Sequence, residues 1–146
     1  MSAAVLLAAA MAVGAPVAID DALLAGLSTE SANFASHGKT QICEGPLLRD
    51  VVARMGAPTG EAVRGPALAQ GILVSARDGY RVVFSLGELD GTLGASGAIL
   101  ATRCDGKRLS ESDGPYRLVV WGELRAARSV RQIATMTLVS FEPKGQ

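Results

Sequence analysis

The sequence predicts an α+β domain in which a mixed β-sheet carries a few short helices. β-favouring apolar runs are grouped along the chain and do not alternate regularly with helices, which favours this class over a doubly wound sheet. The length of 146 residues suits a single domain. With 17 glycines and only 4% aromatic residues, we expect many tight turns and a core of aliphatic side chains.

Residues 1–18 are expected to be a secretory signal peptide, followed by one domain over residues 19–146. This first segment contains no charged side chain, and an apolar run extends from Ala3 to Val13. The run is too short to cross a hydrocarbon core of about 30 Å comfortably, and small residues offer cleavage sites between about residues 12 and 18. No Lys or Arg precedes it, so a buried alanine-rich helix is the alternative. Export predicts a periplasmic or secreted protein.

Two helices are predicted in the first half of the chain. Residues 19–27 form a short amphipathic pattern that begins with two aspartates, where negative charge interacts favourably with the helix dipole. A clearer helix is expected from Pro46, which suits a first helical position, to Met55, with Gly56 as a left-handed C-terminal cap. Its apolar residues recur at intervals of three and four: Leu47, Leu48, Val51, Val52 and Met55.

Loops are expected on both sides of this second helix. The polar residues 28–39 have no strong period, so we expect a loop with at most a short strand before Thr40. Residues 57–70 contain Pro58, Pro66 and several glycines, and are expected to form a long surface loop.

The second half of the chain is predicted to consist mostly of strands. Residues 72–76 and 81–84 are apolar runs separated by Arg77-Asp78-Gly79-Tyr80, in which Asp-Gly is a strong hairpin signal. Ser85 and Glu88 have the spacing at which side chains satisfy free amides at a helix start. Further strands are expected at residues 99–102, 116–121 and 134–141, with turns at Asp105-Gly106 and Asp113-Gly114-Pro115.

Patterns typical of common catalytic and nucleic-acid-binding proteins are missing. The 14 Lys and Arg balance the 14 Asp and Glu, so no bulk attraction for nucleic acid is expected. His37 is the single histidine, and we interpret it as a surface loop residue and not as a general base. The sequence lacks Cys-x-x-Cys, His-x-x-x-His, Gly-x-x-x-x-Gly-Lys and Gly-x-Ser-x-Gly. A zinc site, a phosphate-binding loop or an independent hydrolase is therefore not supported.

Cys43 and Cys104 are the only two cysteines, and each is followed by an acidic residue and a glycine at the end of a predicted strand. An even pair in an exported protein predicts a disulfide. Two separately buried thiols are the alternative, because the sequence does not show whether the two side chains come within bonding reach.

Three arginines and a serine gather just before the last predicted strand, in Arg125-Ala126-Ala127-Arg128-Ser129-Val130-Arg131. A guanidinium group offers a planar fork of donors, so such a cluster can hold an anion or an oxygen-rich heterocycle. On the residues alone, a solvated turn is the simpler interpretation.

Five short segments between Thr40 and Leu138 carry a family resemblance. They are Cys43-Glu44-Gly45-Pro46-Leu47-Leu48-Arg49-Asp50-Val51, Arg77-Asp78-Gly79-Tyr80, Asp105-Gly106-Lys107-Arg108-Leu109, Gly114-Pro115-Tyr116-Arg117-Leu118-Val119-Val120 and Arg128-Ser129-Val130-Arg131-Gln132-Ile133. Their order and spacing resemble the molybdopterin-binding domain of the sulfite-oxidase-like oxidoreductases, in particular its small standalone exported members. The resemblance implies a mixed α+β fold around a bound pterin, with Arg128, Ser129 and Arg131 at the pterin-binding region. We expect a turn or bulge at Ser129, because Arg128 and Arg131 would point to opposite faces of a regular strand.

The chain departs from the enzymes of this family at the metal ligand. Those enzymes hold molybdenum through a cysteine a few tens of residues before the helix, whereas residues 28–40 contain none. Cys43 lies too close to Pro46 to be that ligand in register. Without a thiolate, molybdenum lacks its usual protein anchor, so none is expected here.

These inferences lead to a non-catalytic exported protein that binds a pterin or a related heterocycle and reports it to a partner such as a membrane-bound sensor. One alternative is a molybdopterin-dependent oxidoreductase subunit of the sulfite oxidase type. Another is an interaction module whose pocket is vestigial.

Overall fold

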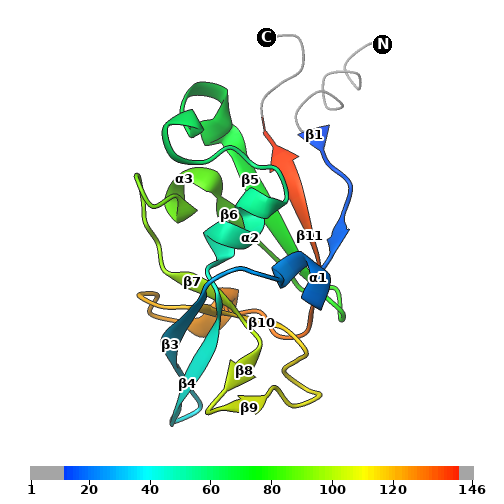
Figure 1. Cartoon of the computed structure of the whole chain (residues 1–146), viewed down its shortest axis with the longest axis vertical. Helices are drawn as coiled ribbons and strands as arrows, with labels where there is room; N and C mark the ends of the chain where they lie inside the picture. Colours follow the sequence, from blue (N-terminus) through cyan, green and yellow to red (C-terminus); the bar gives the residue numbers. More distant parts are fainter. Residues whose placement is uncertain (1–11, 142–146) are drawn as a thin grey trace, which may run out of the picture.

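The computed structural model describes residues 12–141 as antiparallel sheets with short helices packed against them (Figure 1). The largest sheet contains β1 (Ala12–Val13), β11 (Ile133–Ser140), β5 (Gln70–Ala76) and β6 (Arg81–Ser85) in this order, and β2 (Val17–Ala18) also pairs with β11. The strand β11 is therefore central, and β6 forms one edge.

Two smaller sheets complete the strand framework. One has the order β3 (Thr29–Ser36), β4 (Lys39–Pro46), β8 (Arg103–Cys104) and β9 (Lys107–Arg108). The other pairs β7 (Ala98–Ala101) with β10 (Arg117–Val120). In Figure 1 this pair lies between the large sheet above it and the β3–β4–β8–β9 sheet below it.

The helices are short and lie in the connections. The α-helices are α1 (Asp21–Leu24), α2 (Leu48–Arg54) and α3 (Leu86–Leu89), and the 3₁₀ helices are η2 (Gly60–Ala62), η3 (Gly65–Ala69) and η4 (Ala126–Arg128). Among residues 12–141, no helix is long and apolar enough to cross a membrane.

The α+β class is confirmed, but the predicted mixed sheet is wrong, because every strand pairing within residues 12–141 is antiparallel. Antiparallel neighbours can be joined by a two-residue turn, whereas parallel neighbours need a crossover of a dozen residues or more, usually a helix. Short turns join β3 to β4, β5 to β6 and β8 to β9, so these connections permit the antiparallel arrangement alone.

The loop predicted for residues 28–39 is also wrong, since most of it belongs to the β3–β4 hairpin. Ser36 pairs with Lys39, which leaves His37 and Gly38 as a two-residue loop with φ angles of 52° and 77°. Positive φ at both positions matches the twist of a hairpin. The hydrophobic alternation that would have predicted β3 is weak, because Ala32 and Phe34 are its only two buried residues.

Pro46 ends β4 and does not open the following helix, which begins at Leu48. The preceding residue, Gly45, packs closely against β7: a Cβ atom added to it would lie 2.0 Å from the carbonyl oxygen of Leu100. Only glycine lets β4 approach β7 this closely. The predicted C-terminal cap is confirmed in its backbone conformation, since Gly56 has a φ of 100°.

Several local predictions are confirmed. The carboxylate of Asp20 accepts a hydrogen bond from the Leu23 amide at 2.8 Å and caps α1. The hydroxyl of Ser85 accepts one from the Glu88 amide at 3.0 Å and caps α3. The β5–β6 hairpin turns at Gly79, where φ is 90°. The predicted long loop between α2 and β5 contains the two short 3₁₀ helices η2 and η3.

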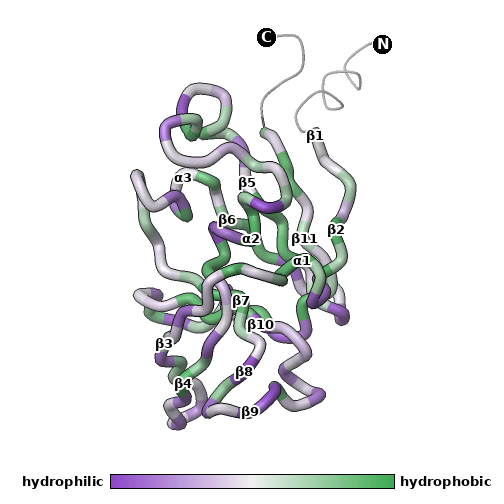
Figure 2. Tube along the Cα trace, in the orientation of Figure 1, coloured by the Kyte–Doolittle hydropathy of each residue, from purple (hydrophilic) through white to green (hydrophobic). Residues whose placement is uncertain are grey.

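The apolar core is divided into two clusters. Figure 2 shows hydrophobic segments gathered on the strands inside the molecule, with hydrophilic ones at the tips of β3, β4 and β9. The larger cluster packs the large sheet against α2 and α3, and its fully buried members include Leu48, Val51, Ile72, Val74, Leu100, Leu118 and Met136. The smaller cluster contains Ala32, Phe34, Cys43, Ile99, Ala101, Cys104 and Val119.

The end of the predicted leader overlaps the large sheet. Val17 and Ala18 of β2 pair with Met136 and Thr135, and the next residue, Ile19, joins the larger cluster. Residues 1–11, which hold most of the predicted signal peptide and of the alternative alanine-rich helix, lie outside the described residues. Cleavage between β1 and β2 would leave β2 in place on β11.

The predicted disulfide is confirmed. Cys43 and Cys104 are joined at an S–S distance of 2.06 Å and face each other across the antiparallel pairing of β4 with β8. Both lie in the smaller cluster, where Cys43 is fully buried. The bond therefore fixes the short β8–β9 hairpin to the β3–β4 hairpin.

Removal of the disulfide is expected to lower the free energy of unfolding by about 4 kcal/mol, because the unfolded chain regains the freedom of a long closed loop. The bond joins positions 61 residues apart. Urea denaturation of the Cys43→Ala/Cys104→Ala variant and of the reduced wild-type protein should give similar losses relative to the oxidised protein. A variant as stable as the oxidised protein would contradict this prediction.

A buried tyrosine ties α1 to the strand β10. The hydroxyl of Tyr116 donates a hydrogen bond to the Asp21 carboxylate at 2.5 Å. Burial, followed by this bond and the negative charge of Asp21, raises the pKa of Tyr116 from 10.0 to about 12. The folded state therefore resists ionisation of this side chain more strongly than the unfolded state does.

The stability that Tyr116 contributes should be fully present below pH 10 and lost between pH 10 and 12, because the unfolded chain ionises first. Urea denaturation of the wild-type protein over this range should show a larger fall in unfolding free energy than the Tyr116→Phe variant shows. The Tyr80→Phe variant is the control and should retain the wild-type fall. Equal falls in the wild-type protein and Tyr116→Phe would refute the assignment.

Candidate functional site

A cleft of about 620 Å³ opens where four distant parts of the chain meet. Its volume lies within the range of about 300 to 1,000 Å³ that is usual for small-molecule sites. The β3–β4 and β5–β6 turns, the start of β10 and the segment after η4 supply its wall. The polar and aromatic residues on this wall are Phe34, Ser36, His37, Lys39, Gln41, Asp78, Tyr80, Asp113, Arg117, Ser129, Arg131 and Gln132.

Arg117 is the buried charge of the cleft wall. Its guanidinium lies 4.2 Å from the centroid of the Phe34 ring and donates to the carbonyl oxygen of Ser129 at 2.8 Å. One nitrogen lies 3.5 Å from the Asp113 carboxylate. Burial lowers the pKa of Arg117, the charge of Asp113 raises it, and the neighbouring Arg131 lowers it. The aromatic face, the carbonyl and the carboxylate together compensate the removal of this charge from water.

Arg117 was not among the site residues predicted from the sequence. It opens the run Arg117-Leu118-Val119-Val120, in which the next two residues are fully buried. The available signal was a charged residue within an apolar strand, because arginine is almost never fully buried unless it is paired. A strand pattern alone does not reveal which distant residues provide the pairing.

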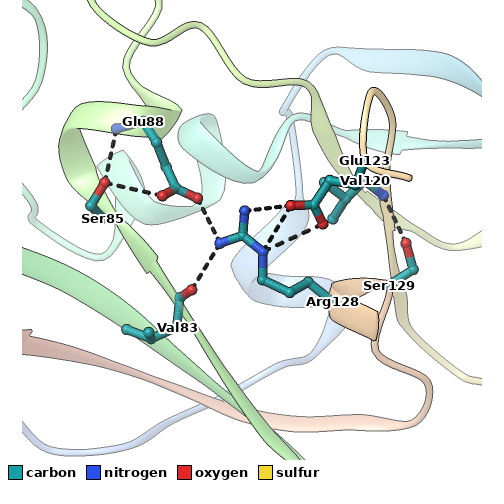
Figure 3. Close-up of polar contacts among 7 residues, drawn as sticks. All are labelled: Val83, Ser85, Glu88, Val120, Glu123, Arg128 and Ser129. Carbon is teal, nitrogen blue, oxygen red and sulfur yellow. Dashed lines mark hydrogen bonds and ion pairs between the residues drawn. The ribbon is translucent and has the colours of Figure 1, made fainter. Parts of the chain in front are cut away.

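Arg128, the first of the three predicted binding residues, lies outside the cleft lining and contacts other partners (Figure 3). Its guanidinium pairs with Glu123 at 2.6 Å and with Glu88 at 2.7 Å. It also donates to the carbonyl oxygen of Val83 at 3.0 Å and lies 4.3 Å from the centroid of the Phe84 ring. The hydrogen bond with Glu123 contributes most to a raised pKa of Arg128, and burial opposes the increase.

These contacts give Arg128 a structural role. Val83 belongs to the edge strand β6, so its outward carbonyl would otherwise offer a pairing point to another strand. Glu88 lies in α3 and also accepts a hydrogen bond from the Ser85 hydroxyl at 3.2 Å. Arg128 therefore joins the segment around η4 to α3 and to the edge of the large sheet (Figure 3).

The other two predicted residues, Ser129 and Arg131, do line the cleft. The hydroxyl of Ser129 accepts a hydrogen bond from the Val120 amide at 3.0 Å. The Arg131 side chain is 63% exposed and lies 4.0 Å from the Asp113 carboxylate. The predicted irregular backbone is confirmed, since η4 ends at Arg128 and Ser129 has φ and ψ angles of −82° and 69°. The irregular backbone does not bring Arg128 and Arg131 to one site, because Arg131 lines the cleft and Arg128 does not.

Two residues of the cleft wall have an uncommon backbone conformation. His37 and Gln132 have φ angles of 52° and 50°, and they are two of the four non-glycine residues with positive φ that residues 12–141 contain. The Gln132 amide donates to the Asp113 carbonyl at 2.9 Å, and its side chain donates to the Glu111 carbonyl at 2.6 Å. Such conformations cost free energy and tend to gather at ligand-binding and active sites.

The residues present do not fit molybdenum held by a thiolate. Both cysteines of the chain form the disulfide, so neither offers a thiolate while the bond is intact. Within the part of the chain that the structure describes, no three His, Cys, Asp or Glu side chains come together in a group that could hold a metal ion.

Replacement of Arg128 by Met is expected to lower the free energy of unfolding by about 1–2 kcal/mol, because Glu88 and Glu123 lose their shared cation. The loss should shrink at high salt, since all three side chains are about one-third exposed. Urea denaturation checks this, with Arg125→Met as the matched control because Arg125 is exposed in the same segment. Equal stability of the two variants would show that the Arg128 contacts do not contribute.

No protein-family model matches the chain, and a search of curated proteins finds no match either. The resemblance of the five segments to the sulfite-oxidase-like family stays a prediction. The candidate site rests on its geometry and on the chemistry of the side chains around it.

Proposed function

We propose that this chain is an exported binding protein for a pterin or a related planar heterocycle, which occupies the 620 Å³ cleft. The observation that carries the proposal is the buried guanidinium of Arg117 on the wall of this cleft, with the exposed Arg131 beside it. The sulfite-oxidase-like resemblance supports a pterin over other planar ligands.

The cleft combines the groups that such a ligand needs. A pterin presents carbonyl and ring-nitrogen acceptors along one edge, and an anionic side chain adds negative charge. Arg131 and the Ser129 hydroxyl supply donors, whereas Asp78 supplies an acceptor for the amino group of the ring. The rings of Phe34 and Tyr80 provide apolar faces at the same cleft.

Arg117 adds a donor whose position is already determined by the fold. A guanidinium has five N–H donors, and the contacts with Leu118, Ser129 and Asp113 occupy one on each of its three nitrogens. The remaining donors are held in a fixed plane by the Phe34 ring. A donor that is ordered before binding loses little conformational entropy when the ligand arrives.

The oxidoreductase alternative is weaker because the chain has no free thiolate for molybdenum. We therefore propose ligand binding without molybdenum redox catalysis, with a membrane-bound sensor as the receiver of the signal. Near-equimolar molybdenum in protein purified from its native compartment would instead support the oxidoreductase alternative.

Titration calorimetry with pterin and pterin-6-carboxylate tests the proposal. The wild-type protein is expected to bind, and Arg131→Ala should weaken binding by about 1–3 kcal/mol, since a charged hydrogen bond is lost. Folding should change little because the Arg131 side chain is mostly exposed. The matched control is Arg125→Ala, which removes an equal charge outside the cleft lining.

Unchanged affinity in Arg131→Ala would place the ligand elsewhere on the protein. If the wild-type protein binds neither compound, the interaction-module hypothesis is favoured. If Arg125→Ala and Arg131→Ala weaken binding equally, the effect is one of general charge and the cleft assignment is wrong.

A further inference from the structure

A second cleft, of about 230 Å³, lies between α1, the β8–β9 hairpin and the chain that leads into β10. Residues from positions 21 to 116 meet there, and Arg103 and Arg108 both line it. It shares no lining residue with the larger cleft. The proposed function leaves these two arginines without a role.

The two arginines lie directly opposite each other. Asp105 and Gly106, with φ angles of 51° and 75°, form the two-residue turn between β8 and β9. Cys104 pairs with Lys107 beside the turn, and Arg103 pairs with Arg108 at the next position. In such a hairpin the second pair is of the non-hydrogen-bonded kind, in which side chains approach more closely. Like charges at this position destabilise the pairing.

Neither arginine of this pair forms an ion pair within the described part of the chain. The ion pairs found within residues 12–141 involve Arg117, Arg128 and Arg131 but neither Arg103 nor Arg108. Glu44 lies opposite Arg103 on β4, yet their charged groups do not come within 4.0 Å in this structure. The Arg103 guanidinium donates one long hydrogen bond, of 3.4 Å, to the Gly106 carbonyl oxygen.

The hairpin that carries the arginines is held firmly. The disulfide joins Cys104 to β4, and the Asp105 carboxylate accepts a hydrogen bond from the Ile42 amide at 2.9 Å. The amide of Thr102 donates to the Glu44 carbonyl at 2.9 Å, which fixes the residue before the hairpin. Cys104 points into the smaller core cluster, so Arg103 and Arg108 occupy the opposite face, towards the cleft.

We propose that this second cleft binds a tetrahedral oxyanion of the phosphate class between Arg103 and Arg108. Two guanidinium forks match the geometry of phosphate oxygens, and Thr102 also lines this cleft. A water molecule takes about 30 Å³ of liquid, so the cleft has room for the ion and part of its hydration shell. The bound ion removes the repulsion that the hairpin otherwise carries.

Asp21 is the one carboxylate on the wall of this cleft, and it is already engaged. It accepts the hydrogen bond of the Tyr116 hydroxyl, which stays protonated at neutral pH because the pKa of Tyr116 is about 12. The two arginines therefore outnumber one hydrogen-bonded carboxylate, and the net charge of the lining is positive.

The test is a titration of the full chain with inorganic phosphate at constant ionic strength, followed by calorimetry. The wild-type protein is expected to show saturable binding, Arg103→Gln and Arg108→Gln at least tenfold weaker binding, and the double variant none. Lys107→Gln is the matched control, because it removes one charge from the same hairpin on the opposite face. Its affinity should stay within twofold of the wild type.

The melting temperature Tm supplies an independent readout, because the Arg108→Gln substitution and bound phosphate are expected to affect it in different ways. Without phosphate, Arg108→Gln should raise Tm because the like-charge pair is gone. Phosphate at a concentration that saturates the wild type should raise Tm in the wild type and in Lys107→Gln, but not in the double variant. No saturable binding by the wild type, or a loss of affinity in Lys107→Gln as large as in the arginine variants, would overturn the proposal. Phenyl phosphate distinguishes the sources: tighter binding than inorganic phosphate indicates a phosphorylated ligand, weaker binding indicates the free ion, and both support the site.

Discussion

Arg117 places a positive charge inside the protein, and the surrounding chain is arranged to stabilise it. The side chain starts on β10, lies over the Phe34 ring of β3 and donates to the Ser129 carbonyl after η4. A buried charge is tolerated only where ring faces, carbonyl groups and a counterion replace water. The contacts of Arg117 with Phe34 and Ser129 therefore join the β3–β4 hairpin to the segment before β11. The larger cleft opens between these elements.

Arg128 and the arginines that line the two clefts differ in their partners. Arg128 is surrounded by Glu88, Glu123 and a backbone carbonyl, so its donors are used to hold the fold and to cover an edge strand. Arg131 is mostly exposed at one cleft, and Arg103 and Arg108 face each other at the other without an ion pair within the described residues. Ligand chemistry is expected where guanidinium groups keep N–H donors that the fold does not use. An arginine of this protein therefore stabilises the fold or is available to a ligand, depending on the carboxylates around its guanidinium group.

The disulfide and the close approach at Gly45 both hold β4 against a neighbouring strand. The first holds β8 against β4, and the second brings β4 against β7 through contact with the Leu100 backbone. Together they build the smaller core cluster, which has few large side chains. A covalent bond compensates for the limited apolar area that so small a cluster can bury. Both clefts border the sheet that this cluster stabilises.

The sequence by itself determined the α+β class, the caps at Asp20 and Ser85, the β5–β6 hairpin and the cysteine pair, because each depends on residue types a few positions apart or on a simple count. It also indicated the irregular backbone at Ser129. The antiparallel pairing of the strands, the burial of Arg117 and the separation of Arg128 from Arg131 were decided by the tertiary structure alone. These features depend on which distant segments pack together, and partners far apart in the chain leave no periodic signal in a single sequence.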